Sequence, residues 1–116
     1  MGERQHDVLN ALAEVIEQRR QADPESSYVA DLLARGRQRI TKKIGEEASE
    51  LIIAALSESP DRVVAEAADL WFHTLVLLAD QGISHERVLD ELERRAGTSG
   101  LTEKARRTVE GDPASG

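Results

Sequence analysis

The stretch VVAEAADLWFHTLVLL, residues 63–78, decides the fold that this sequence predicts. A helix turns by about 100° per residue, so the apolar side chains of this stretch would cover nearly the whole circumference of one helix. Ser59 before it is an N-cap followed by Pro60 in the first helical position, and Gly82 ends the helix after about Gln81. A helix that is apolar on every side must be buried, so we predict that it lies at the centre of the fold.

Four further segments have helical spacing of apolar residues, and no segment alternates as a strand would. The predicted ranges are about 7–20, a short helix capped by Ser26 or Ser27 and ended by Gly36, about 38–56, and one capped by Ser84 that runs to about Arg95. In the third predicted helix the apolar stripe is Ile40, Ile44, Ala48, Leu51, Ile52 and Ala55. The predicted fold class is therefore all-α, with an antiparallel protomer of four to five helices.

One chain of 116 residues has few helices with which to cover a helix that is apolar on all sides. We therefore expect two chains to associate across a two-fold axis as an intertwined helical-bundle dimer. Residues 1–96 form the predicted domain. Residues 97–116 contain few apolar residues and no sustained period, which predicts a flexible or loosely docked C-terminal tail.

Composition argues against several classes of function. The chain has 22 acidic and 15 basic residues and a net charge of −7, which disfavours a general binder of nucleic acid or of anionic membranes. It contains no cysteine, which excludes disulfides, thiolate metal ligands and a cysteine nucleophile. No apolar run is long enough to span a membrane, and the N-terminal residues do not resemble a signal peptide. The expected compartment is the cytoplasm, with neither a nucleic-acid nor a membrane partner.

Acidic residues recur at the same spacing on the two predicted central helices. Glu47 and Glu50 are three residues apart, as are Glu66 and Asp69, and the short connection between the helices predicts antiparallel neighbours. The two pairs can then converge, and buried carboxylates are unfavourable unless a cation compensates them. Carboxylate oxygens suit Mg²⁺ or Mn²⁺ better than zinc, so we predict these four residues as metal ligands. The alternative for the first pair is a solvated acidic surface.

A basic run comes immediately before these acids. Cations one turn away from metal-binding carboxylates would suit a magnesium–polyphosphate substrate. The alternative is a solubilising surface whose cations pair with neighbouring glutamates. The run contains Arg35, Arg37, Arg39, Lys42 and Lys43.

Four other residues each have more than one interpretation. His73 shares a helix face with the second acidic pair, so it could serve the site or be an ordinary hydrogen-bonded residue. Ser27 and Tyr28 could be capping and packing residues, although a nucleoside base could stack on the tyrosine. Glu46 could be a fifth metal ligand, or it could orient a water or act as a general base, which typically contributes ~10²–10⁴ in rate.

Three motifs together resemble a known family. They are SYVADLL at 27–33, KIGEEASE at 43–50 and EAADLWFH at 66–73. The two acidic pairs alone resemble the all-α, MazG-like nucleoside triphosphate pyrophosphatases. With their wider context they resemble the phosphoribosyl-ATP pyrophosphatases of histidine biosynthesis, over about residues 8–95.

The resemblance implies hydrolysis of phosphoribosyl-ATP to phosphoribosyl-AMP and pyrophosphate, the second step of histidine biosynthesis. It also implies Mg²⁺ as the cofactor, with Mn²⁺ as a substitute, and a homodimer. The expected catalytic residues are Lys43, Glu46 and Glu47, and the expected substrate-binding residues are Ser27, Tyr28, Arg39, Lys42, Lys43 and His73. The alternatives are a housekeeping pyrophosphatase for dUTP or a damaged triphosphate, and a helical dimerisation or adaptor module without enzymatic activity.

Overall fold

The computed structural model describes residues 2–97, with side chains from Val8 onward, and this part of the chain contains five helices and no strand. The prediction of an all-α fold is therefore confirmed. The predicted tail, apart from Gly97, lies outside the described residues. The helices are α1 (Gly2–Arg19), α2 (Tyr28–Arg35), α3 (Arg37–Ser57), α4 (Pro60–Asp80) and α5 (His85–Ala96).

Serine caps begin three of these helices, as the sequence predicts. Ser27, Ser59 and Ser84 each accept a hydrogen bond from a backbone N–H in the first turn of α2, α4 and α5, which satisfies a donor that the helix leaves unpaired. Gly36 has a φ of 94° and Gly82 a φ of 69°, in the left-handed region that favours glycine. These glycines let the chain change direction between α2 and α3 and after α4.

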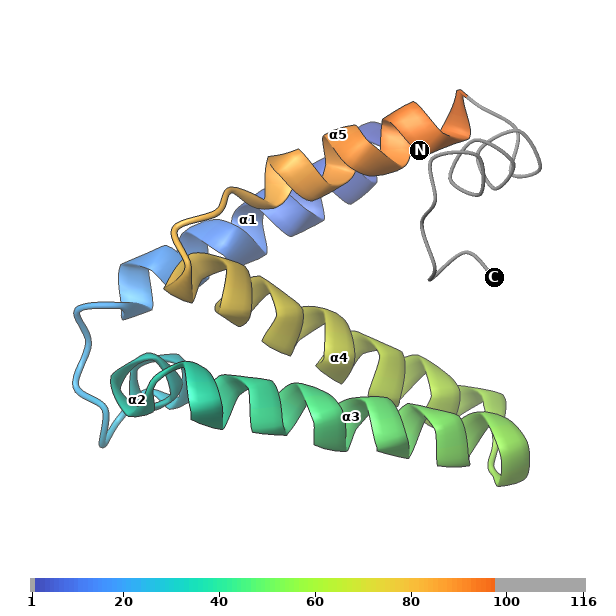
Figure 1. Cartoon of the computed structure of the whole chain (residues 1–116), viewed down its shortest axis with the longest axis horizontal. Helices are drawn as coiled ribbons and strands as arrows, with labels where there is room; N and C mark the ends of the chain where they lie inside the picture. Colours follow the sequence, from blue (N-terminus) through green and yellow to red (C-terminus); the bar gives the residue numbers. More distant parts are fainter. Residues whose placement is uncertain (1, 98–116) are drawn as a thin grey trace, which may run out of the picture. The chain divides into compact units, whose positions relative to one another are not determined.

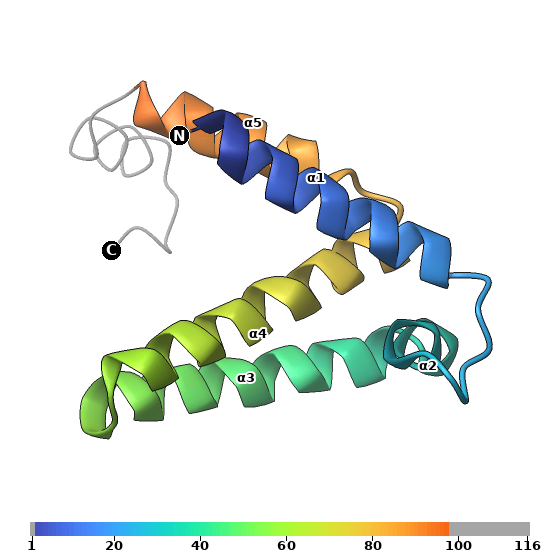
Figure 2. The same cartoon turned by 180° about the vertical axis from the view of Figure 1, so that it is seen from behind.

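α3 and α4 are antiparallel and lie side by side along their lengths (Figures 1 and 2). Only Glu58 and Ser59 separate them in the chain. The contact between the two helices confirms the predicted antiparallel pairing. α1 and α2 pack where α3 begins and α4 ends (Figure 1). Arg20 donates to the carbonyl of Ala79 at 2.7 Å, and Arg37 pairs with Asp80 at 2.9 Å, so both arginines tie the end of α4 to neighbouring elements.

The hydrophobic core lies at this same end of the helix pair. Burying these apolar side chains fixes how α3 rotates against α4, and it therefore fixes which polar residues the two helices present to each other. The core residues are Ile16, Val29, Leu32, Ile40, Leu75 and Val76.

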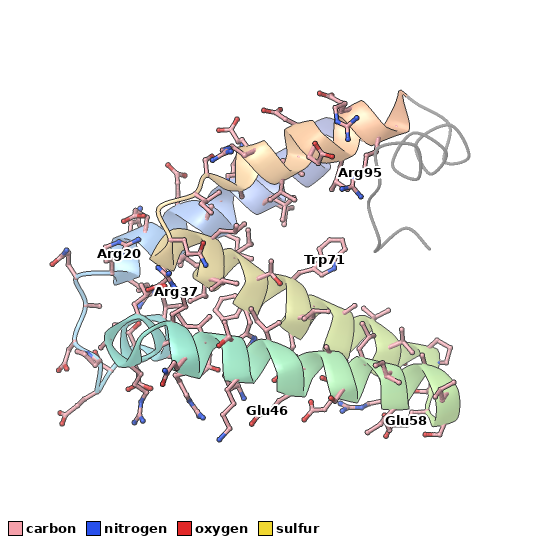
Figure 3. All side chains as sticks on the ribbon, in the orientation of Figure 1. Arg20, Arg37, Glu46, Glu58, Trp71 and Arg95 are labelled. Carbon is pink, nitrogen blue, oxygen red and sulfur yellow. The ribbon has the colours of Figure 1, made fainter. Side chains whose placement is uncertain are left out.

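Over the other half of the pair the described residues leave apolar side chains exposed, so the burial predicted there, which requires a second chain, stays a prediction. On α3 the buried positions are Ile40, Glu47 and Ala54, seven residues apart, whereas Ile52 from the predicted stripe is 59% exposed. On α4 Trp71 is 65% exposed, and Figure 3 shows it projecting away from α3. The physical reason is that α1 and α2 cover only the end of the pair that carries the core.

α5 belongs to a second compact unit, which begins at Ser84. It buries none of its residues, and Val88 and Leu92 are exposed. Arg94 and Arg95 both pair with Glu91, at 2.6 and 2.9 Å. Among the described residues, no helix combines the length and the apolar character needed to cross a membrane.

Candidate active site

Three carboxylates from α3 and α4 lie together at the contact between these helices. Glu47, Glu66 and Asp69 each offer an oxygen, and these oxygens all lie within 4.8 Å of one another. Glu47 is 6% exposed and Glu66 is 3% exposed, whereas Asp69 is exposed. The antiparallel pairing therefore brings both predicted acidic pairs to one place, which solvent reaches from the side of Asp69.

Two buried oxygens of this acidic cluster have no hydrogen-bond partner. They are Oε2 of Glu47 and Oε1 of Glu66. Unpaired buried carboxylate oxygens are unfavourable in a folded protein. Because a hard divalent cation binds such oxygens directly, the donor set of this cluster fits a Mg²⁺-type ion.

Glu50 is exposed and lies next to Glu66. Burial raises the pKa of Glu66, the neighbouring carboxyl of Glu50 raises it further, and Arg62 opposes these effects. Carboxyl groups this close disfavour simultaneous ionisation without a nearby cation. The structure thus places all four predicted metal ligands in one neighbourhood, two of them buried and two exposed.

Arg62 belongs to this neighbourhood, although it is not among the site residues predicted from the sequence. Its Nη2 lies 2.5 Å from Oε2 of Glu66, and its Nε lies 3.5 Å from Oε1 of Glu58. Glu66 is four residues further along α4, a spacing at which side chains on a helix meet, whereas Glu58 lies in the link before α4. That spacing is the signal by which Arg62 could have been found.

Lys43 connects the basic run to the cluster. Its Nζ lies 3.5 Å from a carboxylate oxygen of Glu46 and 3.5 Å from one of Glu47. Burial works to lower the pKa of Lys43, but the Tyr28 oxygen, Glu46 and Glu47 outweigh it, and the pKa stands above its ordinary value. Lys43 is therefore a cation at neutral pH. Glu46 is exposed and projects from the outer side of α3 (Figure 3).

His73 holds Tyr28 at the edge of the cluster. The Nδ1 of His73 lies 2.7 Å from the carbonyl oxygen of Asp69, and the Nε2 lies 2.7 Å from the Tyr28 hydroxyl. A carbonyl can only accept, so Nδ1 carries a proton, and Nε2 forms the hydrogen bond with the hydroxyl of Tyr28. The ring of His73 is 5% exposed and both of its nitrogens are engaged. His73 therefore positions Tyr28 and has no ring nitrogen left to contact solvent.

Tyr28 lies between the basic and the acidic side chains. Its pKa is raised chiefly by burial of the hydroxyl, with Lys43 and Arg39 opposing and the charges of Glu47 and Asp69 adding to the rise. The residue as a whole is 49% exposed, so part of the ring remains open to a ligand.

The other predicted substrate-binding residues divide into two groups. Ser27 is buried and its Oγ accepts from the N–H of Ala30, so it acts as the cap of α2. Arg39 and Lys42 are exposed on α3. At the start of the basic run, Arg35 pairs with Asp31, and Arg37 pairs with Asp80, both outside the carboxylate cluster. The structure therefore brings Lys43 and Tyr28 to the cluster and leaves those two arginines out of it.

These features define a class of protein: an all-α chain whose two long antiparallel helices hold carboxylates suited to a divalent cation, bordered by a lysine and a tyrosine. The family model for phosphoribosyl-ATP pyrophosphohydrolase matches residues 9–96. The chain belongs to this family.

Similar proteins from several bacteria carry the name phosphoribosyl-ATP pyrophosphatase. The protein of Methylococcus capsulatus is 56% identical over 89% of this chain and 98% of its own length. The protein of Methylibium petroleiphilum is 55% identical over 93% of this chain and 90% of its own length. The protein of Neisseria gonorrhoeae is 52% identical over 87% of this chain and 94% of its own length. The similarity therefore spans nearly the whole of each relative.

Proposed function

We propose that the protein hydrolyses phosphoribosyl-ATP to phosphoribosyl-AMP and pyrophosphate in histidine biosynthesis. Membership of the family and the names of its relatives support this reaction. Within the structure, the observation that carries the proposal is the pair of buried, unpartnered oxygens of Glu47 and Glu66 facing Asp69. Such a cluster suits a cation, and a triphosphate brings the anionic groups that a cation would bridge.

The metal of this proposal is Mg²⁺, with Mn²⁺ as a substitute. Its ligands would be Glu47, Glu50, Glu66 and Asp69. Their oxygens favour a hard ion over zinc, and the nitrogens of nearby His73 are already engaged. A bound Mg²⁺ polarises phosphoryl oxygens, lowers the pKa of a coordinated water and neutralises charge on the leaving pyrophosphate.

The surrounding side chains would bind the substrate and move a proton. Lys43 is cationic beside the cluster and would contact phosphate oxygens, with Arg39 and Lys42 as further cations on the exposed side of α3. Glu46 would accept the proton of the attacking water, since Lys43 contacts its carboxylate and that of Glu47 at 3.5 Å each.

The aromatic edge of the site would serve the nucleoside part of the substrate. The exposed part of the Tyr28 ring would stack on the base. His73 would contribute through its hydrogen bond to Tyr28, and Ser27 by fixing the start of α2.

The assembly and compartment of this proposal are a homodimer in the cytoplasm. Exposed apolar side chains on α3 and α4 support the dimer, and the net charge of −7 disfavours nucleic acid and anionic membranes as partners. The exposed side chains are Ile52, Ile53, Leu56, Val64 and Trp71.

The test is side-by-side turnover of phosphoribosyl-ATP, dUTP and ATP with saturating Mg²⁺. We expect the highest kcat/KM for phosphoribosyl-ATP, with phosphoribosyl-AMP and pyrophosphate as products, and complementation of a histidine auxotroph that lacks this step. Preferred turnover of dUTP would point instead to a housekeeping pyrophosphatase. A folded protein that neither binds Mg²⁺ nor turns over any of the three would be an adaptor module.

A further inference from the structure

The most buried carboxylate of the cluster already has a cation on one of its two oxygens. Oε2 of Glu66 accepts from the guanidinium of Arg62, whereas Oε1 has no partner. Glu66 is 3% exposed, so its charge is poorly solvated. Arg62 therefore neutralises a charge that water reaches poorly, on the carboxylate whose other, unpartnered oxygen the proposed metal would use.

Arg62 is not confined to this contact. Its side chain is 56% exposed, and its Nε lies 3.5 Å from the carboxylate of Glu58, which is itself 41% exposed. Glu66 lies one turn further along α4 and Glu58 lies in the link before α4, and the guanidinium of Arg62 is within 3.5 Å of both carboxylates, so it can leave one without losing the other. Leaving Glu66 would not leave the guanidinium without a carboxylate.

We propose that Arg62 is the counter-cation of Glu66 in the metal-free protein. When a divalent cation binds at the cluster, Arg62 leaves Glu66 and pairs with Glu58. This proposal rests on the proposed metal site. A guanidinium and a divalent ion repel each other at one carboxylate. Because coupling between two binding events is reciprocal, the metal weakens the Arg62–Glu66 pair by the factor by which Arg62 weakens metal binding. Arg62 thereby sets the metal affinity and stabilises the acidic cluster when it has no metal.

The experiment compares the whole protein with Arg62→Gln and with the matched variant Arg95→Gln. Arg95 is an arginine of similar exposure, 55%, which pairs with Glu91 within α5, so it controls for the loss of one positive charge. Calorimetric titration with Mg²⁺ alone gives the affinity, and thermal unfolding with and without saturating Mg²⁺ gives Tm.

We expect Arg62→Gln to bind Mg²⁺ roughly three- to tenfold more tightly, as for removal of one partly screened charge near a divalent ion. Its Tm should be below that of the wild type without metal, and the gap should close at saturating Mg²⁺. Arg95→Gln should keep the wild-type affinity and show the same Tm change in both conditions. Arg62→Lys, which keeps the charge as a compact ammonium, should lie between wild type and Arg62→Gln in affinity.

Two results would overturn the proposal, and they are distinguishable. If Arg62→Gln has unchanged or weaker Mg²⁺ affinity and its Tm falls by the same amount with and without metal, Arg62 only forms a stabilising ion pair on α4. If the wild type itself shows no Mg²⁺ binding, the proposed metal site fails and the counter-cation fails with it. Should Arg62→Gln not fold without metal, the affinity of Arg62→Lys decides: a value equal to that of the wild type or weaker contradicts competition.

Discussion

At the scale of single residues, the charge of Glu66 is unfavourable without a metal ion and favourable with one. It is buried beside Glu50 and Asp69, so the metal-free cluster is repulsive, and a bound cation would relieve the repulsion. We expect Mg²⁺ or Mn²⁺ to raise the Tm of the wild type, with about 2.7 kcal/mol gained at 100 times the dissociation constant. The same titration of Glu66→Gln/Asp69→Asn should be flat. An equal response in both proteins would remove these residues from the site.

Tyr28→Phe isolates the hydroxyl that His73 binds. The variant keeps the ring, which stacks near Phe72 with centroids 6.4 Å apart, but it leaves Nε2 of buried His73 without its partner. We expect a loss of about 1–3 kcal/mol in the free energy of unfolding by urea, the penalty for an unsatisfied buried polar group. We also expect a higher KM for the nucleotide. Wild-type stability together with wild-type KM would show that this hydrogen bond does not hold the site.

The carboxylates could be predicted from the sequence, but their differing burial could not. A spacing of three residues on a helix fixes a shared face, which is why both acidic pairs stand out in the sequence. Glu47 is nevertheless buried and Glu50 exposed, because burial depends on how α3 rotates against α4 in the packed fold. The contact between Tyr28 and His73 joins positions 45 residues apart, so no local spacing indicates it.

At the scale of elements, the described residues cover one end of α4 and leave apolar side chains such as Val64 exposed toward the other. Leu75 is 8% exposed in the core, so Leu75→Ala should reduce the free energy of unfolding by about 2–5 kcal/mol. Val8→Ala on α1, where the valine is 58% exposed, is the control and should change it by less than about 0.5 kcal/mol. Denaturant titration measures both. Similar losses for the two variants would contradict the core described for α4.

α5 has a pH dependence of its own. Hydrogen bonds from Arg94 and Arg95 lower the pKa of Glu91 from 4.5 to about 2. A lowered pKa means that the ion pairs stabilise α5 above pH 4.5 and that this contribution is lost as the pH falls through about 2. The carboxyl carbon of Glu91 should titrate near that value by NMR. Its midpoint should rise toward 4.5 in Arg94→Gln/Arg95→Gln. A midpoint near 4.5 in the wild type would mean that neither pair forms in solution.

The helices themselves could be predicted because their signals are local. Serine caps, the proline after Ser59 and the glycines at 36 and 82 place helix ends close to where the structure has them. α1 begins at Gly2, earlier than predicted. The prediction misses its first turns because they lack apolar residues at helical spacing. The apolar stripe of α3 is buried at Ile40 and exposed at Ile52 within one chain, and the sequence does not show that α1 and α2 cover only one end of the helix pair.

At the scale of the whole molecule, the described chain leaves large apolar side chains exposed on its two longest helices. Leu56 on α3 is 82% exposed, and Val64 and Trp71 on α4 are 68% and 65% exposed. Single exposed apolar residues are ordinary, but several on one helix pair are typical of a surface that another protein covers. The sequence of α4 is apolar on nearly all sides, and a second copy of the chain would supply the cover that its open half lacks.

We therefore expect a dimer that buries Trp71. Sedimentation equilibrium at low micromolar concentration should give about twice the 12.8 kDa of one chain. Trp71→Glu places a charge on the surface that the dimer would desolvate, so it should shift the equilibrium strongly toward monomer, whereas Trp71→Phe keeps an apolar ring and should preserve the dimer. Activity should fall with dissociation if the second chain contributes cations from its Arg35–Lys43 run to the site. A monodisperse, fully active wild-type monomer would contradict both the dimer and the burial expected for Trp71.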